Sequence, residues 1–371
     1  MPLVPEHINN LRPYDPGKPM EDVMREYNLK YVVKLASNEN PLGVSPHAIQ
    51  AMIASLYQIN RYPDISSKIL CEKLAEVYNL DVGNIITGHG SEAIMSVIVR
   101  TYLCAGDEVL TSEGTFVGFY VIANAWGIKP ITVPLKDYRF DLEAIADAIT
   151  HKTKIIYLVN PNNPTGNIFT KIEFDKFIER VPSSVMIILD EAYHEFVQGR
   201  PDYPDSMDYR LNNIITLRTF SKAYGLAGIR LGYGFGHNGV IKNLMKVRLP
   251  FEPGIPSQMA GVTALNDHQF LEYYLELNQI GLKYLYSVFE RFGIRYIKSE
   301  ANFVMCVMDS AATVDNIIFR LLTKGVIIRG LKAFGLPHCL RVSVGLQKEN
   351  EFFAEKLEEV LNEINFERKV V

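Results

Sequence analysis

The chain has 371 residues, which is too long for one small core and suits two domains. Apolar residues make up 48% of it and charged residues 22%, and the net charge is −4, as in ordinary globular proteins. Because no long block of one sign occurs, neither a nucleic acid nor an anionic membrane is expected as a partner.

The compartment is indicated by what the chain does not contain. Its first thirty residues hold prolines and charges but no long apolar stretch, so no signal peptide is expected. No run approaches the ~18 apolar residues of a membrane span. The cysteines lie far apart and form neither a CxxC pair nor a disulfide framework; they are Cys71, Cys104, Cys306 and Cys339. We therefore expect a reduced, cytoplasmic protein.

From about residue 85 to residue 250, short β-branched runs alternate with helical periods. This order predicts βαβ crossovers and an α/β fold with a mostly parallel sheet between helices. In such sheets, ligands bind at the carboxyl ends of the strands. The expected strands are 85–87, 108–111, 154–159, 185–189, 214–217 and 230–235, and the expected helices are 91–104, 115–126, 141–149 and 170–180.

The chain changes character at 249–256, where three prolines fall within eight residues. Such a segment favours neither helix nor strand and predicts a boundary. Beyond it we expect a smaller α+β domain with helices over 257–292, strands over 303–307, 326–329 and 340–344, and a terminal amphipathic helix. The expected parts are an arm that packs with the small domain, a large domain and a small domain, over 1–35, 36–250 and 251–371.

The segment 219–232 reads Thr-Phe-Ser-Lys-Ala-Tyr-Gly-Leu-Ala-Gly-Ile-Arg-Leu-Gly and follows an expected strand. Lys222 thus lies near a strand end, beside two hydroxyls and eight residues before Arg230. A lysine that forms a Schiff base must be confined and partly deprotonated, against an ordinary pKa of roughly 10.4. Hydroxyls and an arginine together can bind a phosphate. The glycines of the segment are expected to allow close backbone approach; they are Gly225, Gly228 and Gly232.

Two further segments follow buried strands. Asn-Pro-Asn-Asn-Pro-Thr-Gly occupies 160–166, and Leu-Asp-Glu-Ala-Tyr occupies 189–193. Taken singly, each is most often a turn or a helix cap. Together with Lys222 they indicate a site for a cofactor that contains a pyridine ring. Asp190 can pair with the protonated nitrogen of such a ring and so keep the ring an electron sink. An Asn and a Tyr can donate hydrogen bonds to the phenolic oxygen of such a ring.

A fourth segment, Thr-Gly-His-Gly-Ser-Glu-Ala-Ile at 87–94, lies between an expected strand and an expected helix. Glycines followed by Ser91 at a helix start offer backbone N–H groups and the positive end of the helix dipole to a phosphate. A single glycine-rich turn is a weak signal, and it gains weight from the other segments. His89 is interpreted as incidental, because it has no metal-ligating neighbours in the sequence.

These segments, in this order, resemble the fold-type I pyridoxal-phosphate (PLP) aminotransferases, and most closely the histidinol-phosphate aminotransferase branch. The resemblance covers nearly the whole chain. It includes Leu-Arg-Pro-Tyr-Asp-Pro-Gly-Lys at 11–18, Leu-Ala-Ser-Asn-Glu-Asn-Pro-Leu-Gly at 35–43 and Asn-Arg-Tyr-Pro-Asp at 60–64. The resemblance implies bound pyridoxal 5'-phosphate and a homodimer.

The resemblance also implies roles for individual residues. Lys222 would carry the cofactor and then move a proton, and Asp190 would pair with the pyridine nitrogen. Asn163 and Tyr193 would hold the phenolic oxygen, and Phe116 would stack on the ring. The cofactor phosphate would be held by Ser91, Glu92, Thr219, Ser221 and Arg230, and across the dimer interface by Tyr62.

For the substrate, the resemblance implies that Arg341 binds an anionic group, which in glutamate is the α-carboxylate. Arg329 is a candidate second anion ligand, and Tyr14 and Asn40 are candidates to complete the pocket. The chain departs from the branch at 90–93, where it has Gly-Ser-Glu-Ala in place of Gly-Ser-Asp-Glu. Backbone donors do not depend on side chains, so cofactor binding is expected to survive this change.

The expected reaction is amino transfer from glutamate to imidazole acetol phosphate, with histidinol phosphate and 2-oxoglutarate as products. An aromatic-amino-acid aminotransferase or an amino-acid-phosphate decarboxylase would keep nearly all of the same cofactor residues. A PLP-sensing module of a transcription factor would require a basic winged-helix segment, and none is seen before residue 35. A dinucleotide-dependent dehydrogenase would require GxGxxG after a first strand, and none occurs there.

Overall fold

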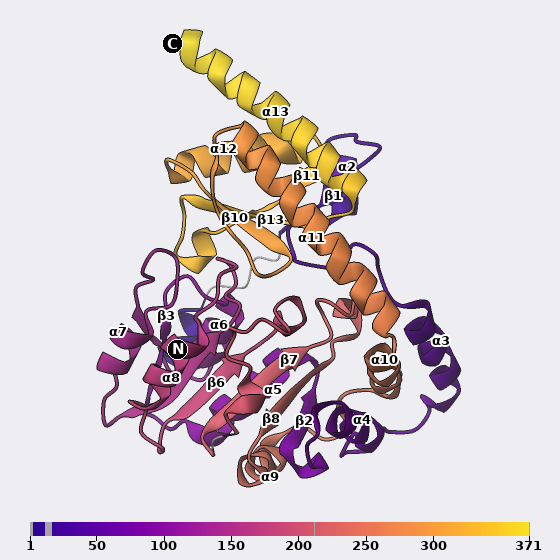
Figure 1. Cartoon of the computed structure of the whole chain (residues 1–371), viewed down its shortest axis with the longest axis vertical. Helices are drawn as coiled ribbons and strands as arrows, with labels where there is room; N and C mark the ends of the chain where they lie inside the picture. The colour runs from indigo at the N-terminus through magenta and orange to yellow at the C-terminus, as the bar shows by residue number, and fades with distance from the viewer. Residues whose placement is uncertain (1–2, 12–16, 211, 371) are drawn as a thin grey trace.

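A seven-stranded sheet forms the larger part of the structure, a computed structural model that describes residues 3–11, 17–210 and 212–370 (Figure 1). The strand order is β2-β8-β7-β6-β5-β3-β4. All neighbouring strands are parallel except β8, which is antiparallel to both β2 and β7. The strands are β2 (Ile85–Gly88), β3 (Glu108–Ser112), β4 (Ile131–Val133), β5 (Thr153–Val159), β6 (Met186–Asp190), β7 (Ile214–Thr219) and β8 (Gly232–Gly236).

The predicted α/β class is thereby confirmed, and each strand expected before residue 250 is present. The central strands β5, β6 and β7 are buried almost throughout, as the unbroken apolar runs predicted. The sequence did not predict β4, because this strand is only three residues long and is partly exposed.

Helices flank the sheet at the four places where the helical periods predicted them, with ends shifted by a few residues, and also at Asn238–Val247, where none was predicted. Helix α8 starts where it does because Thr170 and Glu173 form a capping box, in which each side chain accepts from the backbone N–H of the other. Asp141 caps α7 in a similar way. The flanking helices are α5 (Gly90–Tyr102), α6 (Val117–Ala125), α7 (Leu142–Asp147), α8 (Lys171–Ile178) and α9 (Asn238–Val247).

Three further helices, α3 (Pro46–Ser55), α4 (Lys68–Tyr78) and α10 (Ile255–Asn266), pack together beside β2 and β8. Their shared core includes Leu70, Phe220 and Ala260. The sequence placed Ile255 and Pro256 in a break, but both lie in the first turn of α10. Proline is tolerated there, because the first helical N–H groups have no partner within the helix.

The second sheet is antiparallel, in the order β12-β13-β10-β9. Long helices cover it in the upper part of Figure 1. These elements are β9 (Arg295–Ile297), β10 (Phe303–Val307), β12 (Arg329–Gly330), β13 (Cys339–Ser343), α11 (His268–Arg291), α12 (Ala311–Thr323) and α13 (Gln347–Val370). The short, partly exposed β9 was not predicted.

The single strand expected at 326–329 is wrong in detail. It consists of two short strands, β11 (Val326–Ile327) and β12, which belong to different sheets. β11 pairs in parallel with β1 (Val33–Lys34), whereas β12 pairs with β13. The chain changes its pairing partner at the buried Ile328, so a continuous apolar run became two strands.

The division at residues 35 and 250 stays a prediction. Because β1 pairs with β11, residues 33–34 join the part of the chain that contains α12. Because α10 packs on α3 and α4, we propose that the second boundary lies after α10. The remaining helices are α1 (Glu6–Asn9), α2 (Met20–Glu26), η1 (Leu56–Gln58), η2 (Val82–Asn84), η3 (His194–Phe196), η4 (Ser206–Asp208), η5 (Ala227–Ile229) and η6 (Lys332–Phe334).

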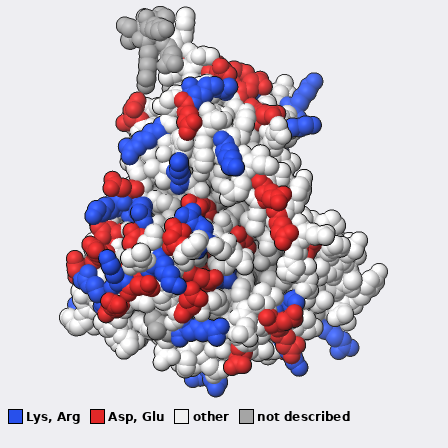
Figure 2. Space-filling view, viewed as in Figure 1, with Lys and Arg blue, Asp and Glu red and all other residues white. Residues whose placement is uncertain are grey.

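Charged side chains of both signs are interspersed over the face shown in Figure 2. This mixture agrees with the near-balanced composition of the sequence. Among the described residues, no helix has both the length and the apolar character needed to cross a bilayer. All four cysteines are unpaired, and only Cys104 is exposed.

Candidate active site

A pocket of about 210 Å³ opens at the carboxyl ends of β5, β6 and β7. It brings together all of the residues expected to bind the cofactor except Tyr62. Val159 and Ala192 also line it, and neither was expected to do so. The full lining is Ser91, Glu92, Phe116, Val159, Asn163, Asp190, Ala192, Tyr193, Thr219, Ser221, Lys222 and Arg230.

Lys222 lies three residues beyond β7, and its Nζ donates to the carbonyl of Ser37 at 3.2 Å. Burial of the amine, reinforced by the cation of Arg341, lowers the pKa of Lys222 to about 8. Glu39 acts in the opposite direction. The uncharged fraction of this amine near neutral pH is therefore larger than that of an ordinary lysine, as a nucleophilic lysine or a lysine base requires.

Asp190 is the last residue of β6 and is 3% exposed. Tyr157 on β5 donates to its Oδ2 at 2.7 Å, and the backbone N–H of Ala192 donates to its Oδ1 at 3.1 Å. Burial raises the pKa of Asp190 to about 6, and these two hydrogen bonds oppose the rise. Above that pH the pocket holds a buried carboxylate that can pair with a cation.

The amide oxygen of Asn163 accepts from Nη1 of Arg341, and Nη2 of the same arginine donates to the carbonyl of Ala36 at 2.7 Å. Because its oxygen is engaged in this way, Asn163 has its amide nitrogen as the donor for a ligand in the pocket. The guanidinium of Arg341 also lies over the ring of Phe303, at 5.1 Å from its centroid. Tyr193 is buried, and its hydroxyl accepts from Asn38 at 2.8 Å.

One part of the pocket, here called the anion corner, is suited to an anion; it is formed by Ser91, Glu92, Thr219, Ser221 and Arg230. Helix α5 begins there at Gly90, whose φ is +76°, and Ser91 and Glu92 of its first turn, whose N–H groups have no partner within the helix, line the pocket. Nη1 of Arg230 lies 3.4 Å from the Ser221 hydroxyl, and Nη2 pairs with Glu92 at 3.2 Å. Arg230 itself has a φ of +54°, a sparsely populated conformation for a side chain of this size.

Near the anion corner, backbone segments approach each other so closely that only glycine fits between them. A Cβ at Gly232 would lie 2.3 Å from the backbone nitrogen of Ser91, so only glycine lets β8 approach the start of α5. A Cβ at Gly225 would lie 2.0 Å from the carbonyl oxygen of Gly43. The expectation for Gly228 is wrong, because nothing lies within 4 Å of a Cβ built there.

The remaining predicted residues lie outside this lining. Tyr62 is 80% exposed and stacks on Phe251 with ring centroids 4.4 Å apart. Asn40 donates to the carbonyl of Ala223, the residue after Lys222, at 2.9 Å. Arg329 is directly opposite Arg341 in the β12–β13 pair. Tyr14 lies outside the described residues.

The sequence missed Asn38 and Tyr157. A tyrosine within the buried run of β5 needs a polar partner, and this requirement could have drawn attention to Tyr157. Asn38 stands in the quoted segment 35–43, but nothing in the sequence indicates that it faces Tyr193, which lies 155 residues away along the chain.

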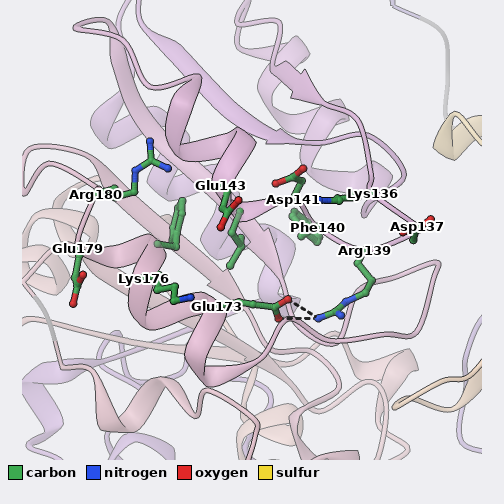
Figure 3. Close-up of a pocket in the computed structure, with 12 residues that line it drawn as sticks. Lys136, Asp137, Arg139, Phe140, Asp141, Glu143, Glu173, Lys176, Glu179 and Arg180 are labelled. Carbon is green, nitrogen blue, oxygen red and sulfur yellow. Dashed lines mark hydrogen bonds and ion pairs between the residues drawn. The ribbon is translucent and has the colours of Figure 1, made fainter.

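A larger cavity of about 640 Å³ lies over α7, α8 and the loop before α7 (Figure 3). It contains none of the predicted site residues. At its surface, Arg139 pairs with both carboxylate oxygens of Glu173 at 2.7 and 3.0 Å. We propose that the chemistry lies in the smaller pocket, because a buried carboxyl, an amine of lowered pKa and a set of anion-binding groups converge there.

Comparison with known proteins agrees with this placement. The family model for aminotransferase class I and II matches residues 30–357. The chain belongs to this family. The prediction made from the motifs is thereby confirmed, as is the fold-type I architecture.

Similar proteins indicate which members of the aminotransferase family this chain resembles. The histidinol-phosphate aminotransferase of Moorella thermoacetica is 42% identical over 97% of this chain and 94% of its own length. Histidinol-phosphate aminotransferase 2 of Hydrogenovibrio crunogenus is also 42% identical, over 97% and 96%. A crystal structure of the Sinorhizobium meliloti histidinol-phosphate aminotransferase in complex with pyridoxal-5'-phosphate superposes with a TM-score of 0.89 at 28% identity. It covers 98% of this chain and 99% of that one.

Proposed function

We propose that this chain is a PLP-dependent transaminase that exchanges the amino group between glutamate and imidazole acetol phosphate. The products are 2-oxoglutarate and histidinol phosphate, and the reaction belongs to histidine biosynthesis. The observation that carries the proposal is the convergence of Lys222, Asp190 and the anion corner in one pocket. Relatives with this activity in their names align over nearly the full chain.

The donor set of the pocket fits pyridoxal 5'-phosphate. A buried carboxyl at Asp190 suits the pyridine nitrogen, and the amide nitrogen of Asn163 and the hydroxyl of Tyr193 suit the phenolic oxygen. The anion corner suits the phosphate, for which it offers a helix start, hydroxyls and a guanidinium; the residues are Ser91, Glu92, Thr219, Ser221 and Arg230. Phe116 lines the same pocket and supplies an aromatic face.

When bound, PLP supplies the electron sink that makes loss of the substrate α-proton feasible. Lys222 holds the cofactor, and its amine then accepts and returns the proton. Its pKa of about 8 suits this exchange near neutral pH. The Asp190 carboxylate keeps the pyridine nitrogen protonated, because a cation is stabilised beside a buried anion.

Arg341 is proposed to bind the substrate carboxylate. Its Nη1 and Nη2 donate to the amide oxygen of Asn163 and the carbonyl of Ala36. A carboxylate would be a stronger partner for the same planar donors than neutral oxygens are. Arg329 lies beside it on the neighbouring strand and is proposed to bind the second anionic group, with Tyr14 and Asn40 completing the pocket.

We further propose a cytoplasmic homodimer. Tyr62 is exposed and lies outside the pocket of its own chain, so its proposed contact with the cofactor phosphate requires a second subunit. Exposed apolar side chains are frequent on α3, η1 and the neighbouring loops; they are Ile49, Ile53, Leu56, Tyr57, Ile59, Ile65 and Phe251. Such a concentration is unusual for a monomer. Figure 2 shows almost no charge over α3. Sedimentation that finds an active monomer would refute the dimer.

The deciding experiment is the visible absorption spectrum of the purified protein after PLP is supplied, before and after histidinol phosphate is added. We expect a visible band that moves to shorter wavelength on addition of this amine donor. A band that responds only to phenylalanine or to threonine phosphate would change the substrate. Absence of any band would contradict the proposed function.

A further inference from the structure

Asn38 lies in the segment between β1 and α3, and its side chain contacts Tyr193, which lines the pocket. It is 1% exposed, and its φ is +55°, in the left-handed region. Asparagine adopts this conformation more readily than most residues. The neighbouring carbonyls of Ala36 and Ser37 accept from Arg341 and Lys222, so the two residues before Asn38 contact charged groups of the site.

Every polar group of Asn38 has a partner. Its backbone N–H donates to the hydroxyl of Ser343 at 2.9 Å, and its carbonyl accepts from Asn302 at 3.1 Å. The Ser343 hydroxyl donates back to Oδ1 of Asn38 at 2.8 Å, and Nδ2 of Asn38 donates to the Tyr193 hydroxyl at 2.8 Å. Ser343 lies two residues after Arg341 on β13, so both side chains leave the same face of that strand.

These contacts have a direction. The hydroxyl of Ser343 accepts one N–H from Asn38, so its own proton is directed to the amide oxygen. The amide therefore has only its N–H₂ side to present to Tyr193. Because the Tyr193 oxygen receives that proton, its own O–H must donate elsewhere, and Tyr193 lines the pocket. Burial raises the pKa of Tyr193 to about 12, so the hydroxyl keeps the proton that it donates.

We infer that Asn38 is a positioning residue that, held by Ser343, turns the Tyr193 hydroxyl toward the phenolic oxygen of the cofactor. This inference rests on the proposed function. A donor at that oxygen withdraws negative charge from it, and loss of the donor changes the proton affinity of the cofactor's conjugated system. The pH at which the visible band changes therefore reports on the direction of the Tyr193 hydroxyl.

The test is Asn38→Asp in the PLP-loaded protein. Aspartate has nearly the same shape and tolerates a positive φ, but its ionised carboxylate can only accept. The Tyr193 proton then turns to the introduced carboxylate and away from the cofactor. We expect the midpoint of the spectral pH titration to rise by about 1 unit, the size expected for a hydrogen bond to a charged group. We also expect weaker PLP binding by equilibrium dialysis.

A double-mutant cycle distinguishes this effect of Asn38 on the Tyr193 hydroxyl, here called the relay, from the direct effect of the introduced negative charge on the cofactor. In a Tyr193→Phe background, Asn38→Asp should move the midpoint by less than about 0.3 units, because the hydroxyl is gone. Equal shifts in both backgrounds, or no shift in the wild-type background, would overturn the inference. Asn167→Asp is the matched control, because Asn167 donates to the carbonyl of Tyr138 at 2.8 Å and does not line the pocket.

Ser343→Ala provides a second route if the aspartate variant does not fold. It removes the donor that fixes the amide, so we expect a smaller shift of the midpoint in the same direction. An unchanged midpoint in a folded Ser343→Ala protein would also contradict the relay. Failure of the wild-type protein to show a visible band would overturn the proposed function itself, an outcome distinct from an unshifted band.

Discussion

Two buried polar clusters meet at the ends of β6 and β7, formed by consecutive residues. Asp190 and Thr219 line the pocket, whereas their neighbours Glu191 and Arg218 belong to a second cluster. Successive residues of a strand point to opposite faces, so one pair of strands serves both clusters. The second cluster, here called the Arg218 cluster, consists of Glu191, His194, Glu195, Asp205 and Arg218.

In the Arg218 cluster, Arg218 pairs with two carboxylates, whereas both carboxylate oxygens of the buried Glu195 have no hydrogen-bond partner among the described residues. Arg218 donates to Glu191 at 2.7 and 2.9 Å and to Asp205 at 3.2 Å, and its guanidinium lies 5.0 Å from the ring centroid of Tyr78. Glu191, His194 and Asp205 lie close enough to ligate a metal ion, but Arg218 already supplies the positive charge.

In the pocket, by contrast, the amine of Lys222 hydrogen-bonds to a carbonyl, and the carboxyl of Asp190 takes its hydrogen bonds from Tyr157 and Ala192. The Lys222 amine and the Asp190 carboxyl thus bond to neutral groups, and we propose that their charges serve a ligand. The paired charges of Arg218, Glu191 and Asp205 are proposed to stabilise the fold. Substitutions in the pocket should therefore reduce activity, whereas substitutions in the Arg218 cluster should reduce stability.

The largest effect is expected for Lys222→Ala. Amino transfer from glutamate should fall by roughly 10⁴-fold or more, since a positioned base contributes up to about that factor and the covalent link is lost as well. PLP should still bind, because the anion corner and Asp190 remain; single-turnover kinetics and equilibrium dialysis measure the two quantities. Lys171→Ala, which removes an exposed lysine paired with Asp208, is the control. Comparable turnover in both variants would remove Lys222 from the mechanism.

Arg218→Met should act on stability. Removing one partner of a buried ion pair leaves the other charge without compensation and costs about 3–5 kcal/mol. Denaturant unfolding measures this loss, and Arg218→Met with Glu191→Gln should recover part of it. The matched control is Arg139→Met, because Arg139 pairs with Glu173 at the surface, where the loss should be at most about 1 kcal/mol. Equal losses for Arg218 and Arg139 would contradict the contrast between buried and exposed pairs.

The two clusters should also differ in how pH affects the PLP-free protein. Burial raises the pKa of Asp190 from 3.8 to about 6 and that of Glu195 from 4.5 to about 7. The folded state then holds protons that the unfolded state has lost, so stability falls as pH rises from about 4 to 6 and from about 4.5 to 7. Asp190→Asn and Glu195→Gln should each remove one component of this pH dependence, on the order of 3 kcal/mol.

Bound PLP should distinguish the Asp190 contribution to the pH dependence of stability from the Glu195 contribution. A cation beside Asp190 compensates its charge, so PLP should suppress the Asp190 component and leave the Glu195 component unchanged. Thermal unfolding across this pH range, with and without PLP, measures both. A Glu195 component that also disappears with PLP would mean that the two clusters are coupled.

The same contrast explains how much the sequence could predict. Asp190, Asn163 and Lys222 follow strands whose apolar runs are local signals, so their place at one sheet edge followed from the pattern. Asn38 and the Arg218 cluster depend on contacts between distant segments, and no local signal specifies them. The contact proposed for Tyr62 depends on a second chain, which no single-chain pattern describes.

The smallest effect is expected for Tyr157→Phe, which alters the pocket without removing a group proposed to touch the cofactor. The Tyr157 hydroxyl donates to Asp190 at 2.7 Å and stabilises its charged form. Without this donor the pKa of Asp190 should rise further, so the acid limb of the pH–rate profile should move to higher pH by about 0.5–1 unit. Turnover on the alkaline side should change less than about tenfold, because Asp190 is ionised there in both proteins.

Tyr120→Phe is the control for this substitution. The Tyr120 hydroxyl donates to the carbonyl of Ser112 at 2.5 Å and not to Asp190, so the acid limb should stay in place although a hydrogen-bonded hydroxyl has been lost here too. An acid limb that moves equally in both variants would reflect general repacking of the sheet. An acid limb that stays fixed in Tyr157→Phe would mean that the ionisation of Asp190 does not set this limb. The proposed difference between the pocket and the Arg218 cluster would then not hold for Asp190.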